Sequence, residues 1–273
     1  MIKKFIYFLL VLPLFIISCK PSAHEMALAE IEKTKQFIAE KQDSAALVCI
    51  DSIHIRYRTD VAVRRMADTL RWNIEYRHAL ITLPQVDSAL SKLQALLPKL
   101  TKQFRFIKSE EYQTSGAFEH RQLLTENNTS RCYLKPSIDE HGKFTLTSYY
   151  LGTKNQHTVV RATVDSLYVE TLVAPSSNIS QFTDVDEYKE IIIYDNELLN
   201  NIHSFIADNR DNRIKISLLG DGQPYHYYLT QIERNILAQS YELSIALTDL
   251  NRLTDQQLKL SQKIELLKMR LNK

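Results

Sequence analysis

The sequence predicts an α+β protein in which helices flank a central antiparallel sheet. Apolar residues recur at helical spacing over 23–110 and again over 229–273. Between these regions, residues 130–228 hold short runs rich in β-branched and aromatic side chains, several of them separated by turn signals. Helices on both sides of a run of strands are typical of an α+β arrangement, in which the terminal helices can pair into one helical layer or stalk.

The first residues predict a signal peptide that ends at a lipid attachment site. A short positive segment is followed by an apolar run that ends at Ile17, and Ser18 and Cys19 come next. The run is shorter than the roughly twenty residues that a bilayer-spanning helix needs. We therefore expect a cleaved signal peptide over 1–18 and a lipidated tether over 19–22. Acyl chains such as palmitate on Cys19 would hold the chain at a membrane.

The helical region 23–110 is predicted to begin with a helical hairpin. The first helix runs to about Gln42, the pair Asp43-Ser44 caps the second, and the third ends at Pro84. Apolar spacings of three and four residues predict the positions that each helix buries. These positions are Ala27, Ile31, Thr34 and Ile38 in the first helix, Ala46, Ile50 and Ile53 in the second, and Val63, Met66, Leu70 and Ile74 in the third.

Two heptad-like seams predict helices with coiled-coil character. One seam lies over 86–107 and is interrupted by a proline, and the other lies in the long C-terminal helix over 253–271. A change of spacing at 251–255 predicts a break in the C-terminal helix. Thr254 and Gln257 have the spacing of a capping box, which would start a new helix there.

The middle region is predicted to be a mostly meandering antiparallel sheet with one helix at 195–209. The turns at 139–142 and 220–222 contain glycines, which supply the positive φ that hairpin turns require. The strands are expected at Arg131–Ile138, Phe144–Leu151, Thr158–Val164, Leu167–Leu172, Tyr188–Tyr194, Arg213–Leu218 and Tyr225–Tyr228.

The composition argues against several functional classes. The formal net charge of +2 resides in the signal peptide, so the exported part has no basic excess for nucleic acid or anionic lipid. The eight histidines show no metal-ligand spacing, and the five glycines form no phosphate-binding loop. We therefore expect no metal, no cofactor and no catalytic residue. Cys49 and Cys132 are expected to be buried free thiols, with a disulfide between them as the alternative.

Tyrosines are the most distinctive residues of the predicted sheet. Adjacent tyrosines such as Tyr227 and Tyr228 must point to opposite faces of their strand, so some of them face solvent or a helix. These two residues are candidates for ligand binding, by stacking on sugar rings or on a peptide. The alternative is that the tyrosines form cross-strand pairs with their hydroxyls at the rim of the sheet.

A repeated Asp-Ser/Thr-aliphatic triplet resembles the O-glycosylation site of exported Bacteroidota proteins. The candidate acceptors are Ser44, Ser52, Thr69, Ser88 and Ser166. Helix capping explains some of the triplets, but it does not explain those at Asp51 and Asp68, which fall within predicted helices. Because a glycan adds bulk and solubility, the triplets indicate a compartment rather than a mechanism.

The whole chain resembles small Bacteroidota lipoproteins that have no known activity. The resemblance rests on the segment 16–19, Ile-Ile-Ser-Cys, which is similar to a lipobox, and on the helical hairpin, the triplets and the sheet followed by a long helix. Surface-exposed relatives typically carry acidic residues after the cysteine. Here residues 20–24 are Lys-Pro-Ser-Ala-His, so we expect the outer membrane, with the domain facing the periplasm.

We expect a lipid-anchored, non-enzymatic envelope protein and consider three roles. The first is protein binding or a structural role, with Leu260, Ile264 and Leu267 as the candidate contacts for another envelope protein. If the two seams bury each other, no partner is needed. The second role is glycan or peptide binding by the tyrosine-bearing sheet. The third is an envelope hydrolase, which requires a carboxylate or histidine cluster in a cleft.

Overall fold

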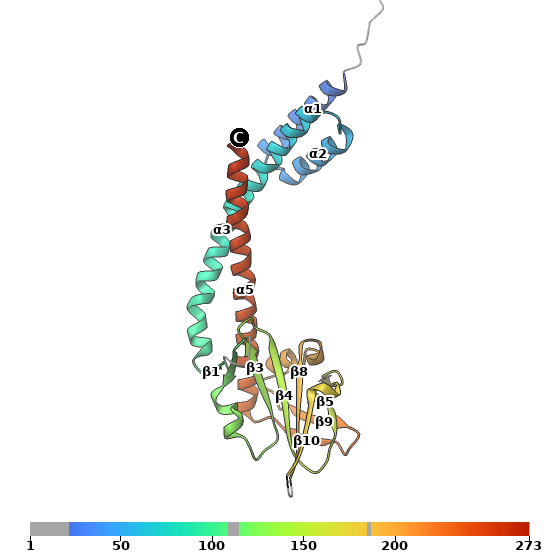
Figure 1. Ribbon diagram of the computed structural model, residues 1–273, viewed down its shortest axis with the longest axis vertical. Helices are drawn as coiled ribbons and strands as arrows, with labels where there is room; N and C mark the ends of the chain where they lie inside the picture. Colours follow the sequence, from blue (N-terminus) through green and yellow to red (C-terminus); the bar gives the residue numbers. More distant parts are fainter. Residues whose placement is uncertain (1–21, 109–114, 185–186, 273) are drawn as a thin grey trace, which may run out of the picture. The chain divides into compact units, whose positions relative to one another are not determined.

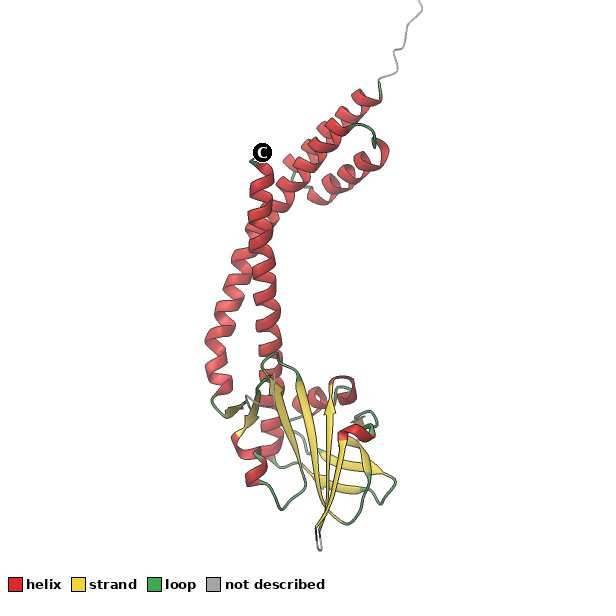
Figure 2. Cartoon of the chain, in the orientation of Figure 1, coloured by secondary structure: helices red, strands yellow, loops and turns green. Residues whose placement is uncertain are grey.

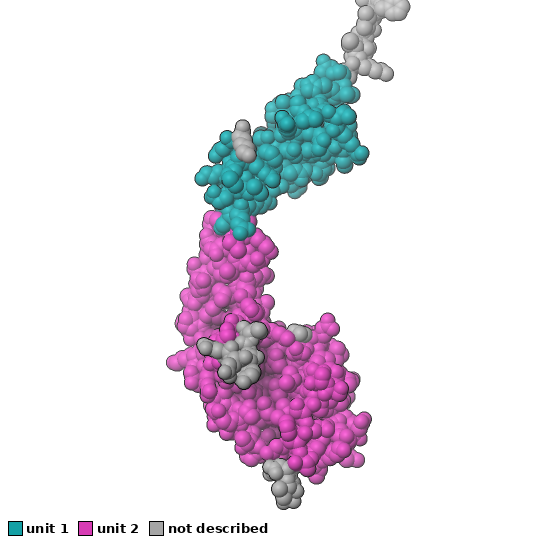
Figure 3. Space-filling view, viewed as in Figure 1, with its two compact units in different colours: residues 1–82, 261–273 teal, residues 83–260 magenta. Residues whose placement is uncertain are grey.

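The computed structural model of the protein describes residues 22–108, 115–184 and 187–272. The chain divides into two compact units, which Figure 3 colours separately. Unit 1 holds the described residues up to Thr82 and from Ser261 onwards, and unit 2 holds Leu83–Leu260. Helices lie towards both ends of the chain and strands in its middle (Figure 2), which confirms the α+β class.

Unit 1 is helical and begins with the predicted hairpin of α1 (Ala23–Ala39) and α2 (Asp43–Arg56) (Figure 1). A capping box starts α1, because the Ser22 hydroxyl accepts from the Glu25 amide and the Glu25 carboxylate accepts from the Ser22 amide. The predicted spacing is confirmed for α1 and α2, and the long helix α3 (Val61–Thr101) adds its first turns to the same core. The buried core residues are Ala27, Ile31, Ala46, Ile50, Ile53, Val63, Ala67 and Ile74.

Four predictions about the helical region are wrong. Asp43 and Ser44 do not cap α2, because Gln42 is its N-cap residue and no side chain makes a capping hydrogen bond there. Met66 is exposed, and Ala67 is the residue that α3 buries next to Val63. The helix α3 does not end at Pro84 but continues past Pro98 to Thr101. Each proline removes one backbone hydrogen bond, and we attribute the tolerance of α3 to its packing along α5. The seam predicted over 86–107 therefore ends in strand rather than helix, because Phe104–Ile107 form β1.

Unit 2 contains two antiparallel sheets rather than the single predicted sheet. The larger sheet has the order β1-β2-β3-β4-β8-β7, and the smaller has the order β10-β9-β5-β6. The predicted strands are all present, whereas β1, β2 and β7 were not predicted. The strand bounds are β1 Phe104–Ile107, β2 Ala117–His120, β3 Tyr133–Asp139, β4 Phe144–Gly152, β5 His157–Val164, β6 Leu167–Glu170, β7 Ile179–Asp184, β8 Glu187–Asp195, β9 Lys215–Gly220 and β10 Tyr225–Tyr228.

The core of unit 2 joins both sheets to helices. Leu146 of β4 and Ile216 of β9 belong to one buried cluster, which also includes Leu243 of α5 (Gln231–Leu271). The predicted helix over 195–209 is two short pieces, a 3₁₀ turn at Asn196–Leu199 and α4 at Ile202–Asp208. They are separated by Asn200 and Asn201, which both have positive φ, a conformation that asparagine tolerates and that interrupts a helix. Three further 3₁₀ turns, Arg121–Leu123, Thr125–Asn127 and Ser176–Asn178, lie in the loops.

The helix α5 is continuous, so the predicted break at 251–255 is wrong. Thr254 does not cap a new helix, because its hydroxyl donates to the carbonyl of Leu250, one turn back. Gln257 donates to the Asp87 carboxylate of α3 at 2.6 Å instead of completing a capping box. The capping box of α5 lies at its start, where the Thr230 hydroxyl accepts from the Glu233 amide and the Glu233 carboxylate accepts from the Thr230 amide.

Glycine is required for different reasons in the two predicted hairpin turns. Gly142 has φ +87°, as predicted, and a Cβ there would also collide with α5 at 2.6 Å from the Ser244 carbonyl. Gly220 and Gly222 do not have positive φ, so that prediction is wrong for them. A Cβ on Gly220 would lie 2.0 Å from the Gln156 carbonyl oxygen. Close backbone packing, not turn conformation, therefore requires glycine in the second turn.

Candidate ligand-binding site

Tyrosines gather in unit 2 where β3 starts, β4 ends and β10 leads into α5. The alternation of side chains along these strands divides them between two environments. Tyr150 is buried in the core, and its ring meets that of Tyr225 edge-on, with centroids 5.2 Å apart. Tyr149 points to the opposite face, where its ring stacks on that of Tyr133 at 4.6 Å and an interplanar angle of 6°. The tyrosines predicted to form cross-strand pairs thus do so in part, since Tyr133 lies opposite Tyr149 in the register.

The two tyrosines that the sequence singles out lie on β10, with the predicted alternation. Tyr227 is half-buried and packs against the core of unit 2, and Tyr228 is 48 % exposed. The guanidinium of Arg213 lies 3.8 Å from the centroid of the Tyr228 ring and covers one of its faces. The two side chains therefore offer different surfaces. Tyr227 offers the part of its ring that the core leaves uncovered, and Tyr228 offers an exposed ring.

Arg131, which lines the same cavity as these tyrosines, is held in place by two acceptors. Its Nη1 donates to the Glu233 carboxylate at 2.6 Å, and its Nε donates to the Asn128 side chain at 2.8 Å. Glu233 is buried and also caps α5, so its position is set by backbone as well as by Arg131. The guanidinium and the carboxylate neutralise each other. The pair therefore offers directed hydrogen-bonding groups without a net charge.

Two cavities adjoin each other at Arg131 and Leu151, which line both. One has a volume of about 170 Å³ and is lined in part by Tyr149 and Ile191. The other has a volume of about 400 Å³ and is lined in part by the tyrosines of β10 and by Glu233. We call the two cavities together the tyrosine site. Its binding-competent side chains are Tyr149, Tyr225, Tyr227, Tyr228, Arg131 and Glu233.

The phenol groups of Tyr225 and Tyr227 remain protonated over the physiological range. Burial raises the pKa of Tyr225 to about 12. Burial likewise raises the pKa of Tyr227 well above its ordinary value, and the nearby Glu233 carboxylate acts in the same direction. These hydroxyls are therefore neutral groups that can donate or accept one hydrogen bond each.

A second polar cluster in unit 2 has the residue types of a hydrolase triad but lies inside the core. Ser148 Oγ is 3.0 Å from His157 Nε2, and His157 Nδ1 is 2.5 Å from Glu190 Oε2. The three side chains are fully buried, and they join β4 and β8 of one sheet to β5 of the other. The Glu190 carboxylate also accepts from the backbone amides of Gln156 and His157. The cluster therefore connects the two sheets and has no cleft of the kind that the hydrolase hypothesis requires.

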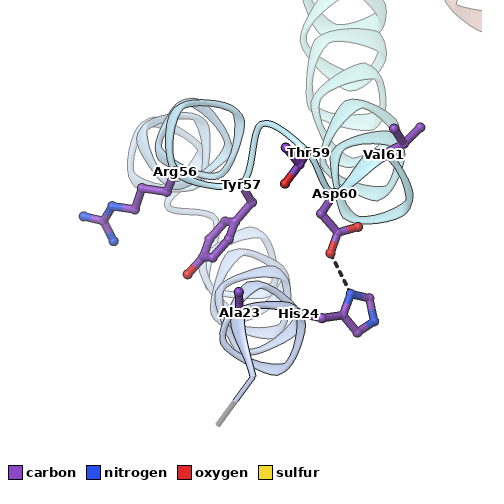
Figure 4. Close-up of a pocket in the computed structure, with 7 residues that line it drawn as sticks. All are labelled: Ala23, His24, Arg56, Tyr57, Thr59, Asp60 and Val61. Carbon is purple, nitrogen blue, oxygen red and sulfur yellow. Dashed lines mark hydrogen bonds and ion pairs between the residues drawn. The ribbon is translucent and has the colours of Figure 1, made fainter. Parts of the chain in front are cut away.

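Unit 1 has its own cavity, of about 460 Å³, where the ends of α1, α2 and α3 meet (Figure 4). Figure 4 shows His24 of α1 pointing at Asp60, which caps α3, with His24 Nδ1 2.6 Å from Asp60 Oδ2. Arg56 in the same wall is paired with Glu30 at 2.8 Å. Because Tyr57 is the one tyrosine among the lining residues of this cavity, the cavity offers fewer phenol rings than the tyrosine site.

The three predicted partner contacts on α5 differ in exposure. Leu267 is only 2 % exposed and is therefore packed inside the chain, which corrects its assignment as a docking contact. Leu260 and Ile264 are half-buried. Within unit 1, Lys263 pairs with Glu75 at 2.9 Å, and the guanidinium of Arg270 lies 5.2 Å from the Trp72 ring. The C-terminal seam thus makes internal contacts with α3.

The candidate glycosylation acceptors all reach the surface to some extent. Ser44, Thr69, Ser88 and Ser166 are exposed, and Ser52 is half-buried. Ser52 and Thr69 donate to backbone carbonyls one turn back in their helices.

The aspartates that precede Ser52 and Thr69 have interhelical partners. Asp51 pairs with Arg71, and Asp68 lies 3.1 Å from His54. Helix-to-helix pairing is therefore a structural reason for aspartate at both positions, which capping does not explain.

The remaining predicted sites divide between described and undescribed residues. Cys19, the predicted lipidation site, lies outside the described residues. Cys49 and Cys132 are free thiols, half-buried rather than fully buried. Among the described residues, no three or more His, Cys, Asp or Glu side chains come together as metal ligands would. Over the same ranges, no helix combines the length and apolar character of a membrane span.

Comparisons with protein-family models, with curated proteins and with solved structures give no match. The tyrosine site is therefore interpreted from its own chemistry. Arg131 and Glu233 were not singled out from the sequence, because they are far apart in the chain and only the fold pairs them. The one local signal was the capping-box spacing of Thr230 and Glu233, which predicts a fixed position for that carboxylate.

Proposed function

We propose that this chain is a lipid-anchored, non-enzymatic binding protein of the cell envelope that takes a neutral glycan chain at the tyrosine site. The observation that carries the proposal is the pair of adjoining cavities that tyrosine side chains line together with Arg131, whose charge Glu233 neutralises. The anchor is the expected lipid on Cys19, and the periplasmic face of the outer membrane is the expected location. The proposal needs no cofactor and no metal.

The chemistry of the site favours a sugar over a charged ligand. Tyrosine rings offer apolar faces and edges that suit the C–H faces of a pyranose, and their hydroxyls offer hydrogen bonds at the rim. Arg131 is already neutralised by Glu233, so the site has no strong attraction for an anion or a cation. Two cavities that share a wall suit a chain of at least two units better than a single small molecule.

Binding rather than catalysis is supported by the burial of the serine, histidine and glutamate cluster. A nucleophile must approach its substrate to about 3 Å, and Ser148 has no exposed surface. The two helical seams support the proposal in another way. Because Leu267 is buried and Gln257 binds Asp87, these two residues make contacts within the chain and are not available to a ligand.

Affinity gel electrophoresis with dextran, laminarin or hydroxyethyl cellulose in the gel tests the proposal. We expect retardation by at least one of these neutral polysaccharides. Tyr228→Ala should weaken binding about tenfold, because an aromatic anchor in a binding site contributes on the order of 1–2 kcal/mol. Tyr227→Phe should weaken it less, since it removes one hydroxyl and keeps the ring that packs on the core.

Tyr168→Ala is the matched control for Tyr228→Ala. Tyr168 is an exposed tyrosine of unit 2 on β6, and it too carries an arginine over its ring, since Arg161 lies 4.6 Å from the centroid. It does not line the tyrosine site. Retardation that both alanine variants lose equally would contradict the assigned site. No retardation by any neutral polysaccharide, or retardation only by the anionic polysaccharide alginate, would overturn the proposed ligand.

A further inference from the structure

An apolar groove lies between α3 and α5 within unit 2, apart from the tyrosine site. Its walls are Leu93, Leu96 and Leu100 of α3 and Ile245 and Ala246 of α5, and its volume is about 450 Å³. Leu96 is 44 % exposed and Ile245 is 46 % exposed. Other apolar residues of the same helices, such as Leu90 and Leu243, are buried inside the unit. Leu96 and Ile245 therefore form an apolar surface between the two helices that the fold of a single chain leaves open to solvent.

The two helices that form the groove are antiparallel. The Gln257 side chain of α5 donates to Asp87 of α3, and further along the pair Leu100 of α3 lines the groove together with Glu242 of α5. Residue numbers rise along α3 where they fall along α5. This is the arrangement of neighbouring helices in an antiparallel bundle, and two such pairs placed face to face complete one with four helices.

The two helices of the groove carry charges of opposite sign. Glu242 and Asp249 of α5 lie in its wall, seven residues apart on one helix face. On α3, the exposed residues Lys92 and Lys99 directly precede Leu93 and Leu100, also seven residues apart. The two acids thus line the groove on one helix, and the two lysines are exposed beside lining leucines on the other helix, with the same repeat along both.

We propose that a second copy of this chain occupies the groove, so that two α3–α5 pairs form a four-helix bundle about a two-fold axis. A two-fold axis parallel to the helices places α3 of each copy against α5 of the other. Leu96 and Ile245 then enter the shared core. Lys92 and Lys99 of each copy face Asp249 and Glu242 of the other, since the two acids and the two lysines have the same spacing. The charge pattern of the surface is therefore complementary to itself about the two-fold axis.

The acidic groups have intrachain partners that do not compete strongly with this arrangement. Glu242 lies 3.1 Å from Arg210, and Asp249 lies 3.0 Å from Arg252 one turn away. Both pairs are exposed, and exposed pairs contribute little. A dimer would also carry two tyrosine sites, which increases the avidity for a polymeric ligand. The dimer itself does not rest on the proposed glycan binding.

Sedimentation equilibrium of the full chain in detergent tests the proposal. The density of the solvent is matched to that of the detergent, so that only the mass of the protein is measured. We expect a dimer at micromolar concentration. Leu96→Glu should weaken the dimer about a hundredfold, because it places an unpaired charge in the shared core. Reversing the charge of both lysines, with Lys92→Glu and Lys99→Glu, should weaken the dimer about tenfold by placing like charges opposite each other. Adding Glu242→Lys and Asp249→Lys to that variant should restore the dimer.

The controls show whether an effect on the dimer is specific to the groove. Val48→Glu changes an exposed apolar residue of α2 in unit 1 and should leave the dimer unchanged. Circular dichroism checks that each variant keeps its helices and sheets. A monomer at all concentrations up to about 100 μM, or a dimer that Leu96→Glu does not weaken, would overturn the proposal. Failure of the fourfold charge variant to recover would overturn the two-fold arrangement. The variant Tyr228→Ala should remain dimeric, so the failure of glycan binding and the failure of the dimer are distinguishable.

Discussion

Unit 1 and unit 2 both join their elements through pairs of a histidine and a carboxylate, but the pairs lie in different environments. In unit 1, His24, His54 and His78 pair with Asp60, Asp68 and Asp43, and each pair connects two helices at the surface. In unit 2, His157 pairs with Glu190 inside the core, between the two sheets.

The difference determines what each pair contributes to stability. Water screens the exposed pairs of unit 1, so the apolar core of that unit supplies most of its stability. The buried pair of unit 2 has already lost its hydration, and its hydrogen bonds offset that cost. Removing one partner from unit 2 therefore leaves a charge or a set of donors without compensation, whereas the same change in unit 1 leaves a remaining group that water can hydrate.

Glu190→Ala should have the largest effect. It leaves the amides of Gln156 and His157 and the His157 ring without their acceptor inside the core. We expect unit 2 to lose about 3–5 kcal/mol of its free energy of unfolding, measured by urea unfolding with the near-ultraviolet circular dichroism of the tyrosines. Glu197→Ala, at an exposed glutamate of the same unit, is the control and should change little. A loss below about 1 kcal/mol for Glu190→Ala would remove the contrast between the units.

Ile50→Ala tests whether the core supplies the stability of unit 1. Ile50 is fully buried in α2, and its truncation should destabilise unit 1 by about 2–5 kcal/mol. Trp72, the single tryptophan of the chain, lies in unit 1, so its fluorescence follows that unit. Ile55→Ala, at an exposed isoleucine of the same helix, should be nearly neutral. If the tyrosine signal shifts with the tryptophan signal, the continuous helices α3 and α5 make the two units unfold together.

The two capping boxes extend the comparison between the units to smaller changes in the free energy of unfolding. Ser22→Ala removes the exposed cap of α1 and should cost about 1 kcal/mol. Glu233→Ala removes the buried cap of α5 and also the partner of Arg131, and it should cost about 2 kcal/mol. Both values come from urea unfolding, each followed with the probe of its own unit. Equal losses would mean that burial adds nothing to the cap of α5.

The smallest expected effect is on the stability of unit 1 in acid, through the surface pair of His78 and Asp43. The hydrogen bond from His78 lowers the pKa of Asp43 below its ordinary value of 3.8, despite some burial. The stabilisation is therefore present above about pH 3.8 and is lost as the pH falls through the lower pKa of the folded state. Asp43→Asn should make the unfolding midpoint of unit 1, followed by Trp72 fluorescence, fall less steeply with acid below that pH. An unchanged slope would exclude a contribution from this pair.

Glu190 provides the buried counterpart of the same test. Burial alone would raise the pKa of Glu190, but the hydrogen bonds from His157 and the backbone amides outweigh it and hold the pKa below 4.5. The stabilisation of unit 2 is therefore complete above about pH 4.5 and is lost as the pH falls through the pKa of the folded state.

Local sequence patterns determined the elements of this protein because helices and strands follow from spacings within a few residues. The hairpin of α1 and α2, the predicted strands and the turn at Gly142 are all found, since each depends on side-chain period or on a glycine conformation. The alternation of Tyr227 and Tyr228 follows from the same geometry. The lipid anchor, which rests on a local motif at Cys19, stays a prediction.

Only the tertiary structure decided which elements continue and which side chains meet. The helix α3 passes through Pro84 and Pro98, and α5 passes through 251–255, because packing between the helices outweighs local breaking signals. The tyrosine site joins Arg131 to Glu233, and the buried cluster joins Ser148 to Glu190, across gaps in the sequence that no spacing rule spans. Such contacts depend on sheet order and burial, which are properties of the whole fold.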